Sequence, residues 1–180
     1  MPRFKRTSHR VSLTAMFASM SLLFLYLASV LPSGRIAMFF LSSIFVMGLV
    51  LEEEIGLAFL MFAAVSLLSL PLLPNPYLVI PYVLFFGHYG IGKFYIETHF
   101  RDKVVRYIIK LLYYNVALVL IYLLIDLADE DLLDTLISFD KIAIWILIPL
   151  AELAFVVYDY AFTKVTGYYF NNIRRKLMKD

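Results

Sequence analysis

The sequence predicts an all-α integral membrane protein with six transmembrane helices and both termini in the cytoplasm. Composition, the spacing of apolar runs and the sidedness of charge lead to this prediction. Hydrophobic residues make up 62% of the 180 residues, and the mean hydropathy is +0.83, whereas soluble domains are roughly 45–50% apolar. Charged residues are only 17% of the chain and cluster between apolar runs, as expected when a chain crosses a bilayer repeatedly.

The apolar runs have about the length needed to cross a hydrocarbon core, which is roughly 17–25 residues. They cover about 11–31, 36–51, 55–73, 77–97, 104–127 and 142–164. We expect them to form a single six-helix domain over 1–180.

Each run ends at a recognisable break. The first ends at "PSGR", the second at the triplet 52–54 of three glutamates, and the third at "PNP", where proline cannot continue a helix. The acidic segment "DLADEDLLDT" follows the fifth run, and the polar tail "TGYYFNNIRRKLMKD" follows the sixth. The first run resembles a signal peptide in position, but it is too long and lacks an A-x-A cleavage pattern, so we expect an uncleaved helix.

Positive charge predicts which side of the membrane each loop occupies. Of the 16 Lys and Arg residues, all but Arg35 and Lys141 fall in the segments 3–10, 93–110 and 164–179. Because positive residues are retained in the cytoplasm, these segments and both termini should be cytoplasmic. The acidic segment 126–134 then faces outward.

Polar residues inside the last three spans fall at two depths, at about 1.5 Å of rise per residue. The middle level contains His88, Asn115 and Glu152, and the cytoplasmic level contains Lys93, Glu97, Lys110 and Asp159. Ionisable groups at such depths should face the bundle interior and be paired. The cytoplasmic level allows two intramembrane ion pairs, Lys93 with Glu97 and Lys110 with Asp159, which are either structural pairs or site residues.

The middle level has two interpretations. His88 either donates one hydrogen bond between helices or contacts a ligand. If a cavity is present, the middle-level residues are its polar lining. Its aromatic walls would then be Tyr82, Tyr114, Tyr122 and Trp145.

The stretch 87–93, "GHYGIGK", has the spacing of a phosphate-binding loop but not its chemistry. Such a loop needs Ser or Thr after the lysine, and Phe94 stands there. We instead expect Gly87, Gly90 and Gly92 to permit close helix approach or local unwinding beside a cavity.

Other catalytic patterns fail as well. "EEEIGLAF" lacks the arginine that a membrane CAAX-type protease would need, and the chain has no G-x-S-x-G or H-E-x-x-H motif. Cysteine is absent, and the three histidines lie at different predicted depths. We therefore expect no enzyme activity, metal site, cofactor or nucleic-acid partner, although Glu152 with Asp159 leaves a carboxylate-based site open.

The first span reads "SLTAMFASMSLLFLYLASVLPSGR", and five further spans follow. In this first helix, length and topology, the chain resembles the substrate-binding S-component of energy-coupling factor (ECF) vitamin transporters. The resemblance implies a protein of the prokaryotic cytoplasmic membrane that binds a small vitamin-like solute for uptake. It also implies a re-entrant-like loop between the first two helices, and a separate transmembrane coupling subunit with two ATPase subunits as partners.

The resemblance also suggests which residues bind and dock. In place of the family's A-x-x-x-A docking pattern, the chain has Ala15-x-x-x-Ser19 overlapping Thr14-x-x-x-Ala18, small residues that allow another helix close. The solute pocket would lie in the outer half, capped by the loops at Arg35 and Asn75. The candidate substrate-binding residues are Arg35, Asn75, Tyr82, His88, Asn115, Trp145 and Glu152. A non-transporting assembly or regulatory subunit remains the alternative, followed by an ion or proton pathway.

Overall fold

The structure is a computed structural model that describes residues 7–31, 33–128 and 141–168. These residues form helices and their connections, and no strand occurs among them. The all-α prediction is therefore confirmed for the described part of the chain. The chain divides into two compact units, 1–121 and 122–180, and each is described by itself.

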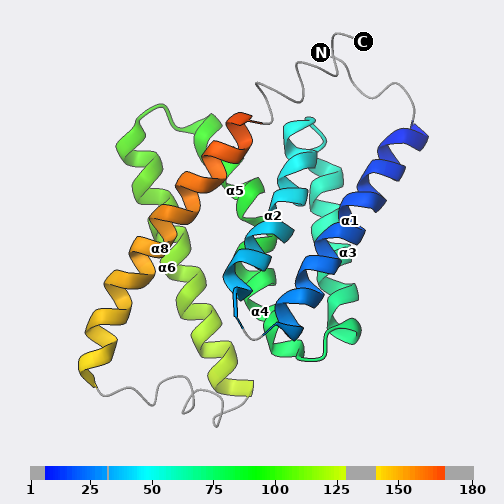
Figure 1. Ribbon diagram of the computed structural model, residues 1–180. Helices are drawn as coiled ribbons and strands as arrows, with labels where there is room; N and C mark the ends of the chain where they lie inside the picture. Colours follow the sequence, from blue (N-terminus) through cyan, green and yellow to red (C-terminus); the bar gives the residue numbers. More distant parts are fainter. Residues whose placement is uncertain (1–6, 32, 129–140, 169–180) are drawn as a thin grey trace. The chain divides into compact units, whose positions relative to one another are not determined.

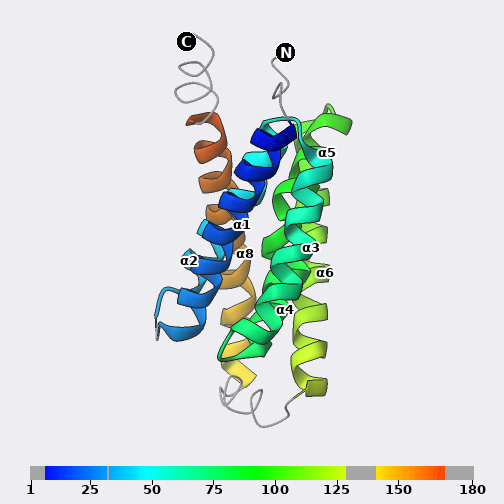
Figure 2. The ribbon, with the colours of Figure 1, turned by 90° about the vertical axis from the view of Figure 1, so that its right-hand side faces the viewer.

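The first unit is built from consecutive helices joined by short connections. Its helices are α1 (Thr7–Val30), α2 (Arg35–Leu51), α3 (Ile55–Leu72), η1 (Pro76–Leu78), α4 (Val79–Pro81), η2 (Tyr82–Phe86), α5 (Gly87–His99) and the part of α6 (Lys103–Ala128) up to residue 121. Helix α1 packs on α2 and α3, and α5 packs on α2 and α3. Figures 1 and 2 show α1, α2, α3 and α5 side by side.

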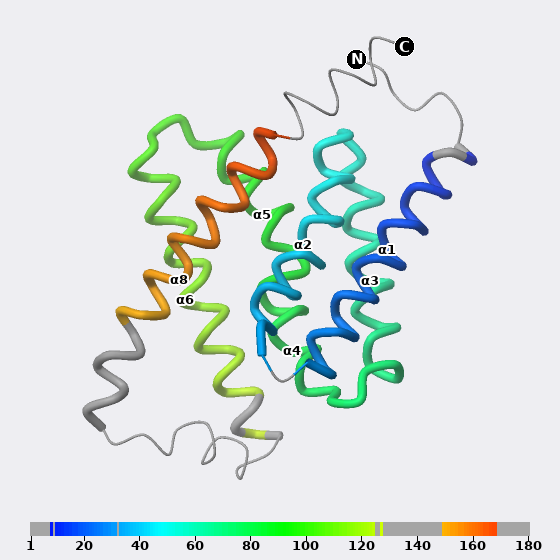
Figure 3. The backbone as a smooth tube through the Cα atoms, viewed as in Figure 1, coloured from blue at the N-terminus to red at the C-terminus, as the bar shows by residue number. Residues whose placement is uncertain are grey.

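The turn between α2 and α3 follows from its hydrogen bonds. The N–H of Glu54 donates to the carbonyl of Leu49 at 2.9 Å, and the N–H of Glu53 donates to that of Val50 at 3.0 Å. This is the Schellman pattern, which needs a left-handed residue just beyond the helix end. Glu53 fills that position with φ 64°, and the chain reverses at once into α3 (Figure 3).

The connection between α1 and α2 differs from the one that the resemblance implies. Helix α1 ends at Val30 and α2 begins at Arg35, with Gly34 in the left-handed region at φ 80°. Residues 31–34 are too few to enter and leave a bilayer. The expectation of a re-entrant-like loop here is therefore wrong, because Val30 and Arg35 already belong to the two helices.

The predicted fourth span, 77–97, is helical but is not one uniform helix. Asn75 Oδ1 accepts a hydrogen bond of 3.0 Å from the N–H of Tyr77 and so begins the 3₁₀ turn η1. The π-helical segment η2 follows Pro81, and the N–H of Gly87 donates to Tyr82 O, five residues back. A proline lacks the N–H of the regular ladder, and π turns of this kind are frequent at functional sites.

The start of α6 has a conventional cap. Asp102 Oδ1 accepts from the N–H of Val104 at 2.9 Å, which satisfies one of the free N–H groups of a helix start. The second unit contains the end of α6 and α8 (Lys141–Tyr168), which has Pro149 inside it.

Within the described ranges, three helical segments are long and apolar enough to cross a membrane: Arg10–Val30, Ile55–Leu72 and Lys103–Leu124. Helix α2 is apolar but shorter, at 17 residues. Large apolar side chains are exposed on these segments, among them Leu67 of α3, which is 68% exposed, and Leu112 of α6, which is 64% exposed. Such a surface is expected of a protein that lipid surrounds, since soluble monomers rarely expose large apolar patches.

Candidate functional site

The candidate site lies where the start of α5 faces α6 in the first unit. The ring of His88 packs edge to face against that of Tyr113, with centroids 5.7 Å apart and planes at 71°. On its other side His88 contacts Phe62 of α3, with centroids 5.3 Å apart. The His88 Nδ1 atom and the Tyr113 hydroxyl oxygen are both buried and make no hydrogen bond. A buried polar atom without a partner costs about 1–3 kcal/mol, so two such atoms on facing rings mark a site.

Gly87, at the end of the π segment, allows a close contact between α5 and Phe62 beside His88. A Cβ atom at Gly87 would lie 2.7 Å from Cδ2 and Cε2 of Phe62 and 2.9 Å from Cε1 of Tyr82. No side chain fits at that distance, so the glycine lets the Phe62 ring lie directly against α5. The predicted role of Gly87 in close helix approach agrees with this geometry.

The helices η1, α4, η2 and α5 together form the fourth helical segment, 76–99, and one face of this segment contacts the Tyr113 ring. Phe85 and Tyr89 contact that ring, with centroids 6.1 and 6.3 Å away. Gly92 follows His88 by one turn and therefore shares its face. A Cβ atom at Gly92 would lie 3.7 Å from the Tyr113 hydroxyl oxygen, which is an ordinary contact. The glycine thus leaves a methyl-sized space beside that hydroxyl.

A cluster of buried hydroxyl groups lies between α1, α2 and the π segment. The Oγ atoms of Ser21 and Ser42 are 2.6 Å apart, and the Tyr82 hydroxyl lies 3.4 Å from Ser21 Oγ. Ser42 Oγ also donates to the carbonyl of Ser21 at 3.1 Å. All three residues are 0% exposed. Tyr82, predicted to line a cavity, therefore takes part in bonds between helices.

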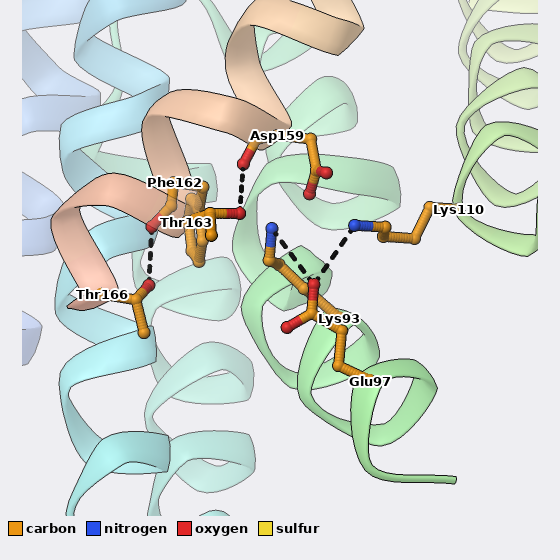
Figure 4. A network of polar contacts seen from close by, with 7 residues as sticks. All are labelled: Lys93, Glu97, Lys110, Asp159, Phe162, Thr163 and Thr166. Atoms are coloured by element: carbon orange, nitrogen blue, oxygen red, sulfur yellow. Dashed lines mark hydrogen bonds and ion pairs between the residues drawn. The ribbon is translucent and has the colours of Figure 1, made fainter. Parts of the chain in front are cut away.

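The charged residues predicted for the cytoplasmic level meet at Glu97 in the first unit. Lys93 Nζ lies 3.5 Å from Glu97 Oε1, and Lys110 Nζ of α6 donates to the same oxygen at 3.2 Å. Figure 4 shows both lysine side chains directed at this carboxylate. Lys93 is only 2% exposed. Because a buried charge is costly without an opposite charge, the contact with the Glu97 carboxylate stabilises Lys93 in this position. Asp159 lies in the second unit, and its pairing with Lys110 stays a prediction.

Within α8, the threonines bond to their own helix. Thr163 Oγ1 donates to the carbonyl of Asp159 at 2.8 Å, and Thr166 Oγ1 donates to that of Phe162 at 2.6 Å (Figure 4). Glu152 is half-buried in the same helix. Trp145 also belongs to α8, but its side chain lies outside the described part.

The other predicted binding residues lie in separate places. Arg35 is the exposed first residue of α2, and Asn75 caps η1. Asn115 donates from Nδ2 to the carbonyl of Leu111 in its own helix at 3.0 Å. The α6 residue that contacts His88 is Tyr113, two positions earlier, which a helix turns by about 200° from Asn115.

The predicted docking residues lie on the outer side of α1. Ala15 and Ser19 are exposed, whereas Thr14 and Ala18 are half-buried. Both hydroxyl groups bond within the helix, Thr14 Oγ1 to the carbonyl of Arg10 at 2.8 Å and Ser19 Oγ to that of Ala15 at 2.9 Å. These bonds satisfy the polar groups and leave a smooth face of small side chains.

Sequence reasoning missed Tyr113 and the contact of Arg10 with Glu54. The Arg10 guanidinium forms an ion pair with the Glu54 carboxylate, which joins the start of α1 to the turn before α3. A signal for Tyr113 was present, because it lies ten residues into α6 and so at nearly the depth of His88. A tyrosine hydroxyl both donates and accepts hydrogen bonds, so Tyr113 belongs with the polar residues of the middle level.

Among the residues that the structure describes, no group of three His, Cys, Asp or Glu side chains is placed to hold a metal ion. Comparison with protein-family models, with curated proteins and with solved structures finds no match.

Proposed function

We propose that this protein is a six-span integral membrane protein that binds a small solute for uptake, in the manner of an S-component. The observation that carries the proposal is the facing pair of His88 and Tyr113, whose buried Nδ1 and hydroxyl atoms make no hydrogen bond. Purely structural polar groups inside a membrane protein are expected to be bonded within it. Two such polar atoms on adjacent helices can fix the orientation of a bound solute.

The helix bounds support the six-span topology. The composite segment 76–99 and α8 exceed the roughly 20 residues that a crossing needs. In the first unit, the Arg10–Glu54 pair brings the start of α1 to the α2–α3 turn. Lys93, Glu97 and Lys110 meet where α5 ends and α6 begins. This arrangement agrees with alternating crossings whose charged ends face the cytoplasm.

The outer face of α1 supports a partner that docks between helices. Its exposed small residues, Ala15 and Ser19, have Met16 and Met20 beside them, which are 52% and 44% exposed. Small residues let helices approach closely, and methionine side chains adapt to a partner. We propose that a transmembrane coupling subunit, served by two ATPase subunits, docks here in the prokaryotic cytoplasmic membrane.

Native mass spectrometry of the protein, extracted in mild detergent from its own host's membranes, tests this proposal. We expect a retained small molecule, or co-purifying coupling and ATPase subunits. Ala15→Leu should remove the subunits by blocking the docking face, whereas the same change at exposed Ala154 of α8 should not. Recovery of the chain without solute and without such subunits would contradict the proposal.

A non-transporting assembly subunit is the second candidate, and the bonded polar clusters favour it. The Ser21–Ser42–Tyr82 hydroxyl groups and the Lys93–Glu97–Lys110 ions bond to one another, as they would in a scaffold. In that case the same mass spectra would show the chain bound to other membrane proteins, with no solute and no ATPase.

A further inference from the structure

We infer that the solute is an uncharged molecule with a planar apolar body that carries one compact hydrogen-bonding group, a hydroxyl or a carboxamide. This inference rests on the proposed function, because it assigns a chemical class to the solute of that site. It follows from the polar atoms of the site, from the rings around them and from the position of the nearby charges.

A solute group that both donates and accepts satisfies the polar atoms of the site whichever nitrogen of His88 carries the proton. A neutral histidine nitrogen either accepts or donates one hydrogen bond, and a tyrosine hydroxyl does both. At the contact of the two rings, the buried atoms that make no hydrogen bond are one of each kind, His88 Nδ1 and the Tyr113 hydroxyl. Their rings are in edge-to-face contact, so a single hydroxyl or primary carboxamide is small enough to serve both. An ester or a simple ether has no proton to give, so it cannot satisfy Nδ1 in the tautomer whose Nδ1 accepts.

The rings around these atoms favour a planar apolar body. Phe62 packs against His88, and Phe85 packs against Tyr113. Aromatic rings prefer offset or edge-to-face contact with another planar group. Gly92 adds space at the hydroxyl of Tyr113, so that a substituent beside the polar group does not meet a side chain.

The charges of the first unit argue against an ionised solute. Lys93 and Lys110 are both directed at Glu97, which lies nine residues beyond His88 and therefore about 13 Å further along the helix. An anion at the level of His88 would give up its hydration while the buried lysines that the structure describes in this unit are directed at Glu97 instead, which is costly at such depth. A neutral solute avoids that cost.

The test uses three fluorinated probes of one shape: 4-fluorobenzamide, 4-fluorobenzyl alcohol and 4-fluorobenzoate. Fluorine NMR of each probe is recorded with the full chain in lipid nanodiscs, and empty nanodiscs provide the blank. We expect protein-dependent broadening for the amide and the alcohol but not for the carboxylate. Tyr113→Phe, which deletes one oxygen and keeps the ring, should weaken binding of the amide about tenfold, the effect of losing one buried hydrogen bond.

Matched variants separate the site from general effects. His88→Phe keeps a ring against Phe62 and should weaken the amide by a similar factor. Tyr95→Phe makes the same chemical change as Tyr113→Phe on an exposed tyrosine of α5, 56% exposed, and should leave binding unchanged. Size-exclusion profiles and melting curves of all variants show whether each folds.

Four results would overturn the inference: equal or tighter binding of the carboxylate, no binding of any probe at millimolar concentration, unchanged amide binding in Tyr113→Phe, or a retained solute that proves to be charged. A charged retained solute would still support the proposed function. Absence of both solute and transport partners would instead remove the proposed function itself.

Discussion

At the scale of single residues, side-chain size decides how closely the helices of the first unit approach. Gly87 lets the Phe62 ring lie against α5, and Gly48 does the same for Phe17, whose Cε2 would be 2.8 Å from a Cβ atom there. Gly56, by contrast, is exposed and would meet no atom within 4 Å. Glycine identity is therefore required at the first two positions and not at the third.

Gly87→Ala is expected to destabilise the protein by about 1–3 kcal/mol, because the new methyl group overlaps the Phe62 ring and the core must shift. Unfolding in detergent, followed by circular dichroism, would measure this. Gly56→Ala is the matched control and should be neutral or slightly stabilising. Phe62→Leu should restore part of the lost stability, and equal stability of the two alanine variants would show that the contact is unimportant.

The left-handed residue Glu53 gives a second prediction at this scale. A β-branched side chain is strained at φ 64°, whereas glycine adopts this conformation freely. Glu53→Val should therefore be less stable than Glu53→Gly by about 1–2 kcal/mol, measured by the same unfolding assay. The same pair of changes at Glu52, where φ is −84°, should show no such advantage for glycine.

At the scale of helices, polar side chains join α1, α2 and the segment 76–99. Apolar side chains alone would not hold these helices together, because they contact lipid tails about as favourably as they contact one another. Hydrogen bonds and close packing must therefore supply the specificity. The Ser21–Ser42–Tyr82 cluster supplies it for α1 and α2. Glu97 supplies it for α5 and α6 by contacting Lys110.

Ser21→Ala should lower stability by about 0.6 kcal/mol, with an upper value of about 1.7 kcal/mol, the range for hydrogen bonds between membrane helices. A double-mutant cycle with Ser42→Ala measures the coupling between the two hydroxyl groups. Ser66→Ala removes a hydroxyl that donates to the carbonyl of Phe62 within α3, and should cost less. Strictly additive losses at positions 21 and 42 would contradict the proposed link.

Glu97→Gln should destabilise the protein because buried Lys93 loses its carboxylate contact. Since Glu97 is 36% exposed, we expect about 1–2 kcal/mol, less than the 3–5 kcal/mol that breaking a fully buried pair costs. Adding Lys93→Met should recover stability, because the buried charge is then removed as well. No recovery in the double variant would indicate that Lys93 depends on other contacts.

At the scale of the whole molecule, the central prediction is the topology, and the chain suits a direct test because it has no cysteine. Single cysteines can be placed in connections whose residues are exposed: Ser33 and Pro74 on the expected outer side, and Arg101 on the expected inner side. Six crossings with cytoplasmic termini make the first two reactive toward an impermeant maleimide in intact cells. Arg101→Cys should react only after permeabilisation.

Labelling of Arg101→Cys in intact cells would contradict the topology, since it would place the α5–α6 connection outside. Protection of Pro74→Cys from the reagent would contradict the prediction that the connection between α3 and the segment 76–99 lies outside. A cysteine at Leu67, exposed in the middle of α3, serves as the lipid-facing control and should resist the reagent under both conditions.

The sequence by itself determined the helical class and most helix boundaries, and it predicted the polar levels. An apolar run long enough to cross a bilayer, a break at proline or charge, and a rise of 1.5 Å per residue are local properties. The predicted runs 36–51 and 55–73 therefore differ by one residue from α2 (Arg35–Leu51) and α3 (Ile55–Leu72). The same counting placed His88 midway along its span and Glu97 near the end that is predicted to be cytoplasmic.

Only the tertiary structure decided which side chains meet. It brought Tyr113 to His88, Ser21 to Ser42 and both Lys93 and Lys110 to Glu97. It also made the fourth segment pass through a π turn. The physical reason is that these helices are apolar nearly all round, so their sequences carry only a weak signal for rotation about the helix axis. That rotation depends on every neighbour at once, including rings such as Phe62 that lie far away in the chain.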